Sequence, residues 1–97
     1  MKDVFKALAH PARRAILRHL RDGPLYAGDI AERFDFTKPT LSGHLKLLKD
    51  AGLVQAERNG ANIRYRLNVS VAEETAAALM EMVGGNVDAD RGAKADP

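Results

Sequence analysis

A run of short polar and cationic side chains is interleaved with leucines between residues 37 and 49. Hydroxyl, imidazole and ammonium groups can hydrogen-bond to the edges of DNA bases or pair with phosphate oxygens. Leu41, Leu45 and Leu48 recur at i, i+4 and i+7, which predicts the buried stripe of a helix ending near Asp50. The side chains expected on or beside its outer, DNA-reading face are Thr37, Lys38, Thr40, Ser42, Gly43, His44 and Lys46.

A second group of polar and basic side chains lies in two strand-like runs, residues 53–58 and 63–67. The Asn-Gly pair between these runs is a strong hairpin signal, because both residues tolerate positive φ. In the second run Ile63, Tyr65 and Leu67 alternate with arginines, so one face is apolar and the other basic. The residues expected to reach flanking DNA from this hairpin are Arg58, Asn59, Asn62 and Arg64.

The charge of the chain is unevenly distributed. The 97 residues carry a net charge of +2, with +6 in residues 1–66 and −4 in residues 67–97. A basic body favours a polyanionic partner such as nucleic acid, although many soluble domains carry a similar excess without one. The chain has no cysteine, which excludes disulfides, thiolate metal sites, thiol redox sensing and cysteine nucleophiles.

Catalytic and metal-binding groups are sparse. Asp29, Glu32 and His44 are the acid–base candidates in the middle of the chain, and no nucleophile elbow, phosphate loop or metal cluster accompanies them. His10, His19 and His44 fall on separate predicted elements without ligand spacing. We therefore expect neither an enzyme nor a bound cofactor or metal. No apolar run approaches the roughly 20 residues of a membrane helix, so a cytoplasmic protein is expected.

The elements that position these groups can be predicted from periodicity and helix-breaking residues. A short helix around Val4 precedes a helix that begins at Pro11 and stops at residues 22–24. Helices over about 27–33 and from Lys38 or Pro39 to 50 follow, and Thr37 or Lys38 caps the second of these. The hairpin and a last helix over about 71–83 complete a mainly α (α+β) winged helix-turn-helix, one domain over 1–83. Residues 84–97 are expected to be a disordered tail.

Five segments together resemble winged-helix repressors of the ArsR family, with the Ser-x-His-Leu-x-x-Leu pattern of their recognition helix starting at Ser42. The segments are residues 8–17 (LAHPARRAIL), 27–31 (AGDIA), 37–48 (TKPTLSGHLKLL), 51–54 (AGLV) and 64–67 (RYRL). The resemblance covers about residues 3–83. Lys-Pro-Thr at the start of the recognition helix, and residues 68–71 after the wing, resemble the SdpR-like autorepressor branch.

The resemblance implies a sequence-specific repressor that binds double-stranded DNA as a homodimer, with its terminal helices paired across a two-fold axis. Recognition helices about one DNA turn apart, ~34 Å, would read an inverted repeat. The residues expected at the dimer interface are Val4, Phe5, Leu8, Ala72, Ala76, Leu79, Met80 and Val83. The alternative is that the apolar residues of the first and last helices pack only within their own chain.

Two residues depart from the family pattern, His10 where an acidic cap is usual and Gly43 where a larger side chain is usual. Metal and thiol sensing are not expected, because the family's usual cysteine or histidine ligands are missing. Constitutive repression, a small-molecule inducer or a sequestering protein partner remain as ways of control. A nucleoid-type or activator DNA-binding protein, or a winged-helix protein-interaction module, are the alternative functions.

Overall fold

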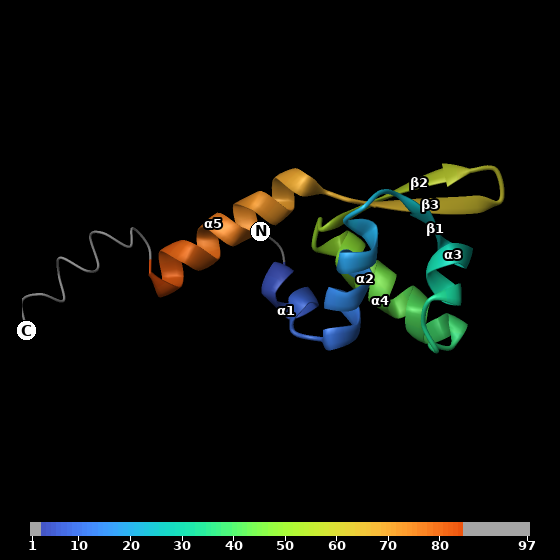
Figure 1. The fold of residues 1–97 in the computed structure, drawn as a ribbon, viewed down its shortest axis with the longest axis horizontal. Coiled ribbons are helices and arrows are strands. Elements are labelled where there is room, and N and C mark those ends of the chain that lie inside the picture. The colour runs from blue at the N-terminus through green and yellow to red at the C-terminus, as the bar shows by residue number, and fades with distance from the viewer. Residues whose placement is uncertain (1–2, 85–97) are drawn as a thin grey trace, which may run out of the picture.

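The computed structural model describes residues 3–84, and these form a mainly helical winged helix-turn-helix with a β-hairpin wing (Figure 1). The predicted tail over 84–97 lies outside the described residues, apart from Gly84. The elements in chain order are α1 (Val4–Leu8), α2 (Pro11–Leu20), β1 (Leu25–Tyr26), α3 (Ala27–Glu32), α4 (Lys38–Asp50), β2 (Val54–Asn59), β3 (Asn62–Leu67) and α5 (Val69–Val83).

Local capping explains where the helices start. At the start of α2, His10 accepts a hydrogen bond at Nδ1 from the Ala12 amide at 3.0 Å, so this histidine acts as the N-cap. Thr37 is the N-cap of α4, because its Oγ1 accepts from the Thr40 amide at 3.3 Å. Asn68 caps α5 in the same way through the Val71 amide, so α5 starts two residues before the predicted boundary.

The wing belongs to a three-stranded antiparallel sheet in the order β1-β3-β2. The sequence did not indicate β1, whose two residues pair with Tyr65 and Arg64 of β3. Asn59 pairs with Asn62, so the hairpin loop is shorter than predicted and consists of residues 60–61. Gly60 has a φ of +65°, and Asn59 does not share the positive φ that its type would permit.

The hydrophobic core lies where the four helices α1 to α4 meet the start of β2. Its buried apolar members are Val4, Ala7, Ile16, Leu20, Ile30, Leu41, Leu45, Leu48, Ala51, Leu53 and Val54. Burying one leucine or isoleucine side chain stabilises a fold by about 1.5–3 kcal/mol. Val4 was predicted to face a second copy, and that prediction is wrong because Val4 is fully buried in the core of its own chain.

Helix α5 packs on the body only near its start. Val71 lies against the core, and Thr75 is buried and donates to the Val71 carbonyl at 2.7 Å. Figure 1 shows the rest of α5 leading away from the body, at the opposite end of the molecule from the tip of the β2–β3 hairpin. The apolar residues along this outer part of the helix are therefore exposed to solvent.

Candidate nucleic-acid interface

Helix α4 presents a polar face to solvent and an apolar face to the core. Leu41, Leu45 and Leu48 are buried as predicted. The exposed residues at its start and along its outer face are Thr37, Lys38, Thr40, Ser42, Gly43 and Lys46. Residues 37–46 therefore expose three hydroxyls, a glycine backbone and two amines, which are groups that can bind base edges and phosphates.

The hydroxyls at the start of α4 are joined to each other. Thr37 Oγ1 donates to Thr40 Oγ1 at 3.0 Å while it accepts from the Thr40 amide. The Thr40 hydroxyl is thereby held as an acceptor toward Thr37, and its own hydrogen remains to donate outward. This pair fixes the direction of a donor at the exposed end of the helix.

Gly43 has no packing reason to be a glycine. A Cβ built at this position would meet no heavy atom within 4 Å, and the backbone there is helical. Glycine in a helix interior costs up to about 1 kcal/mol relative to alanine. The missing side chain lets a partner approach the backbone of α4 closely at the middle of its polar face.

His44 was predicted to face DNA, and the structure corrects this prediction. The side chain is buried, at i+3 from Leu41 and between the rings of His10 and Phe36, with centroids 4.7 and 5.1 Å away. Its Nδ1 lies 3.2 Å from Arg13 Nη1 of α2. Arg13 is also buried. His44 therefore belongs to the interior and not to the exposed polar face.

Burial lowers the pKa of His44 below its usual value of 6.5, and the neighbouring His10 and Arg13 lower it further. The contribution of His44 to the free energy of unfolding is therefore fully present above pH 6.5, where His44 is neutral in both folded and unfolded chains. It falls as the pH drops below 6.5, because the unfolded chain binds the proton first.

The wing holds some of its predicted contact residues in contacts within the chain. Arg64 Nη2 forms an ion pair with Glu57, its cross-strand neighbour, and Asn59 Nδ2 donates to the Tyr26 hydroxyl at 2.9 Å. Arg58 and Asn62 are exposed at the end of the hairpin. The structure thus orients Arg64 and Asn59, while Arg58 and Asn62 extend into solvent beside the loop.

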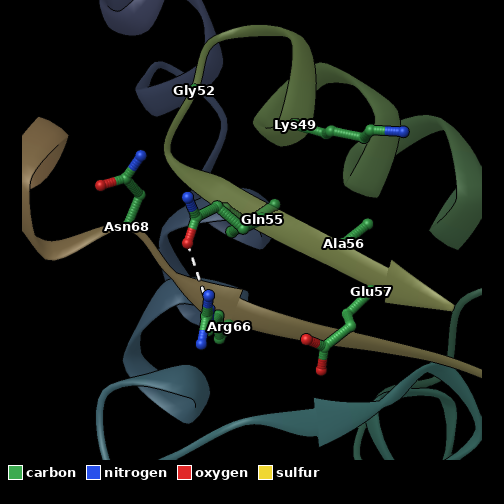
Figure 2. Close-up of a pocket in the computed structure, with 8 residues that line it drawn as sticks. Lys49, Gly52, Gln55, Ala56, Glu57, Arg66 and Asn68 are labelled. Atoms are coloured by element: carbon green, nitrogen blue, oxygen red, sulfur yellow. Dashed lines mark hydrogen bonds between the residues drawn. The ribbon is translucent and has the colours of Figure 1, made fainter. Parts of the chain in front are cut away.

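Two open cavities adjoin these elements. The one of about 360 Å³ lies between α3, α4 and β3 and separates the exposed face of α4 from the wing. Its lining residues are Ala27, Gly28, Ala31, Lys38, Leu41, Ser42, Leu45, Ile63 and Tyr65. The other, of about 470 Å³, lies on the outer face of the hairpin, where Gln55 Oε1 accepts from Arg66 Nε at 3.1 Å (Figure 2). Lys49 extends along the α4 side of this second cavity.

Helix α1 and the outer part of α5 each carry exposed apolar side chains. Those predicted at a dimer interface and found exposed are Phe5, Ala76, Leu79, Met80 and Val83, and Leu8 and Ala72 are half-buried. Val69 and Met82 are also exposed and were not predicted. We call Phe5, Leu79, Met80, Met82 and Val83 the α1/α5 apolar surface.

Two further properties of residues 3–84 concern metal ions and membranes. No group of three or more His, Asp or Glu side chains in this part of the chain is arranged to hold a metal ion. Among the helices of the same residues, none has both the length and the apolar character that spanning a bilayer requires.

Comparison with known proteins identifies the family. Residues 8–57, which run from the end of α1 into β2, match the family described as "Helix-turn-helix domain". The chain is 41% identical to the transcriptional repressor SdpR of Bacillus subtilis over 86% of its own length and 92% of that protein. It is 43% identical to the arsenical resistance operon repressor of Staphylococcus xylosus, over 70% of this chain and 65% of that one.

The chain belongs to the ArsR family of transcriptional repressors. An ArsR-like transcriptional regulator from Rhodococcus sp. RHA1 superposes with a TM-score of 0.77, at 31% identity, over 94% of this chain and 85% of that one. This ArsR-family protein is thus a DNA-binding repressor and not an enzyme. The predictions of the winged helix-turn-helix fold and of the family are confirmed.

Proposed function

We propose that this repressor acts as a homodimer on an inverted-repeat operator, with the exposed face of α4 in the major groove. The observation that carries this proposal is the exposed polar face of α4, backed by a buried leucine stripe. A major groove accommodates one α-helix, and each base pair presents a distinct pattern of donors and acceptors there. In this proposal residues 1–83 are the DNA-binding and dimerisation domain. The repressor acts in the cytoplasm.

Each exposed group of α4 has a role that its chemistry supports. Lys38 pairs with a phosphate or with guanine acceptors, Ser42 donates to or accepts from a base edge, and Gly43 lets the helix backbone approach the groove. Thr40, held by Thr37, donates near the helix N-terminus, which favours a phosphate. Lys46 forms an ion pair with Asp50 at 2.8 Å, and both side chains are largely exposed, so water screens the pair and a DNA phosphate can replace Asp50.

The wing provides contacts outside the major groove. Arg58 and Asn62 are exposed beside the loop and are the groups that reach the flanking backbone or minor groove. Arg64 and Asn59 support them, since Glu57 and Tyr26 hold these two side chains in place. An arginine in a narrow minor groove responds to the shape of the DNA and not to the identity of a base.

A second copy of the chain covers the α1/α5 apolar surface in this proposal. A large exposed apolar patch marks an interaction site in soluble proteins, and a small domain buries a limited core of its own. Leu8, Ala72 and Ala76 lie at or near this surface and contribute to the same contact. Two-fold pairing through it would present two copies of α4 to successive turns of DNA.

We further propose that this repressor does not sense metals. The chain has no cysteine, and residues 3–84 hold no cluster of three possible ligands. Constitutive repression, a small-molecule inducer and a sequestering protein partner remain as ways of control, and the resemblance to the autorepressor branch implies the protein partner. Calorimetric titration with Zn²⁺ should show no tight stoichiometric binding, and a submicromolar site would contradict the proposal.

The DNA-binding proposal is tested by selecting bound duplexes from a random pool and measuring their affinity by gel shift. The selected duplex should contain an inverted repeat and bind ~10³-fold tighter than random DNA. Lys38→Ala should weaken binding to all sequences and reduce the salt slope by about 1, whereas Ser42→Ala should relax preference at one base pair of each half-site. Lys6→Ala, on the exposed surface of α1, is the matched control and should bind as the wild type does.

An architectural role is the second candidate function, and the same selection distinguishes it. A nucleoid-type protein would enrich no sequence and would bind random DNA as well as any selected duplex. Unchanged binding by both the Lys38 and the Ser42 variants would instead show that α4 does not contact DNA. A winged-helix module that binds only protein would instead select no duplex.

A further inference from the structure

A buried arginine joins three helices at the centre of the domain. Arg13 of α2 donates from Nε to the Ala7 carbonyl at 2.7 Å and from Nη2 to the Lys6 carbonyl at 3.2 Å. These two carbonyls belong to α1. The remaining nitrogen, Nη1, faces His44 Nδ1 of α4 at 3.2 Å. One guanidinium therefore connects the last turn of α1 with the middle of α4.

The chemistry of the Arg13–His44 contact determines the state of the imidazole. An arginine has five N–H donors and no acceptor, so His44 Nδ1 must accept. His44 is consequently neutral, with its proton on Nε2. A protonated His44 would place an N–H donor against an N–H donor and one cation beside another.

The position of this contact relates it to both proposed interfaces. His44 directly follows Gly43, and Ser42 lies two residues before it, on the exposed polar face of α4. Phe5 directly precedes Lys6, whose carbonyl Arg13 binds, and Phe5 belongs to the α1/α5 apolar surface. A hydrogen bond from Arg13 thus lies between the helix proposed to read DNA and the helix proposed to meet a second copy.

We propose that Arg13 is a positioning residue for DNA recognition, which holds α4 against α1 and α2 through a hydrogen bond that requires a neutral His44. This inference deepens the proposed function and rests on the assignment of α4 as the reading helix. Arg13 itself does not touch DNA, because it is buried. Its effect on binding comes from the orientation of α4 relative to the second copy.

The proposal makes operator binding sensitive to acid. The charged and titratable groups that act on His44 are Arg13 of α2 and His10 at the start of α2. On the α1 side, Arg13 also donates to the backbone carbonyls of residues 6 and 7. The ring of Phe36, in the α3–α4 connection, contacts the His44 ring. When His44 takes up a proton, the hydrogen bond to Arg13 is lost and α4 is released.

The predicted change in operator affinity on acidification is opposite in sign to the change that the added positive charge alone would cause. A protein that gains positive charge on acidification binds phosphates more strongly. Release of α4 should instead weaken binding to the selected duplex, by up to about tenfold for each pH unit below the pKa of His44, which itself lies below 6.5. Binding to random DNA should stay constant or strengthen over the same interval.

The experiment measures the affinity of full-length variants for the duplex that the wild type selects, at pH 7.5 and at decreasing pH values below 6.5 at which circular dichroism shows the protein folded. His44→Asn keeps a neutral acceptor near the place of Nδ1 but cannot be protonated, so it should bind nearly as wild type at pH 7.5 and lose the acid effect. Arg13→Lys cannot bond to α1 and α4 together, and it should bind about tenfold more weakly at pH 7.5.

Arg14→Gln is the matched control. Arg14 is an exposed arginine of the same helix that donates to the Leu8 carbonyl at 2.7 Å and makes no contact with His44. This variant should keep both the affinity and the pH profile of the wild type. His10 and His19 remain in all variants, so any acid effect that they cause would persist in His44→Asn and would overturn the proposal.

A readout without DNA separates this inference from the proposed function. Nitrogen NMR of the histidine rings should show His44 as the neutral Nε2–H form, with a midpoint below 6.5 that rises in Arg13→Lys. If the protein selects no duplex but this result holds, the DNA-reading assignment fails and the Arg13–His44 contact stands. A midpoint of 6.5 or above in the folded wild type, verified by circular dichroism, would overturn the contact itself.

Discussion

Helices α4 and α5 are both amphipathic, but the chain covers the apolar stripe of one and leaves most of the other exposed. In α4, Leu45 and Leu48 are only 4% and 0% exposed. In α5, Leu79 and Met80 are 45% and 49% exposed. The first helix shows solvent its hydroxyls and amines, and the second shows solvent its leucine and methionines. The two exposed faces therefore suit different partners, DNA for α4 and a second apolar surface for α5.

The largest effect, on the free energy of unfolding, is expected from truncating a buried leucine of α4. Leu48→Ala removes a fully buried leucine from the core and should lower the free energy of unfolding by about 2–5 kcal/mol, because a cavity adds to the lost burial. Ser42→Ala on the exposed face of the same helix should change it by less than about 0.5 kcal/mol. Urea denaturation of both variants measures the contrast, and similar losses would break the distinction between the two faces of α4.

The next effect concerns the uncovered stripe of α5. Leu79→Glu combined with Met80→Glu should leave the fold intact but shift the protein from dimer to monomer in analytical ultracentrifugation. Operator affinity should then fall at least tenfold, because a monomer engages one half-site. Glu81→Gln, also exposed on α5, is the control and should remain dimeric. A wild type that sediments as a monomer at micromolar concentration would contradict the proposed dimer.

The smallest effect sharpens the assignment of α4. Gly43→Ala and Gly28→Ala both add a methyl group to a helical position where nothing lies within 4 Å. Each should therefore stabilise the fold by up to about 1 kcal/mol. Only Gly43→Ala should also weaken operator binding, since its methyl group lies on the proposed DNA-reading face. Equal DNA affinities of the two variants would mean that α4 does not approach the groove closely at residue 43.

The helix boundaries were predictable because local chemistry marks them. Pro11, Pro39 and Gly52 each specify a backbone conformation without help from distant residues. Strand β1 was not predictable, because two residues cannot show an alternating pattern and its pairing with β3 joins positions about 40 residues apart. Gly60 shows the same limit on a smaller scale, since the register of the strands, and not the Asn-Gly pair alone, decided which residues form the loop.

The candidate site was predicted less completely than the fold. The helical spacing of two of its residues explains why. His44 lies at i+3 from Leu41, and Arg13 lies at i−3 from Ile16, so each occupies a position on the buried stripe of its helix. The polar character of these two side chains favoured an exposed position, whereas their helical spacing favoured a buried one. The helical spacing gave the correct, buried position of both residues, because each polar group is the hydrogen-bond partner of the other. That pair joins residues 31 positions apart and is therefore a property of the tertiary structure. The exposed residues from Lys38 to Gly43 needed no such partner.

The start of α5 lies beside the residues that end α4, and this junction is the pivot about which any tilt of α5 would turn. Gly52, with φ of +82°, ends α4 in a left-handed turn, and a Cβ there would lie 3.7 Å from Val71 of α5. The Asn68 amide donates to the Leu53 carbonyl at 2.9 Å beside it. A 15-residue helix is about 22 Å long. Tilting α5 by about 10° at this pivot moves its far end by almost 4 Å, close to the rise of one base pair. In the proposed dimer, the angle of α5 at this junction would therefore set the spacing of the operator half-sites.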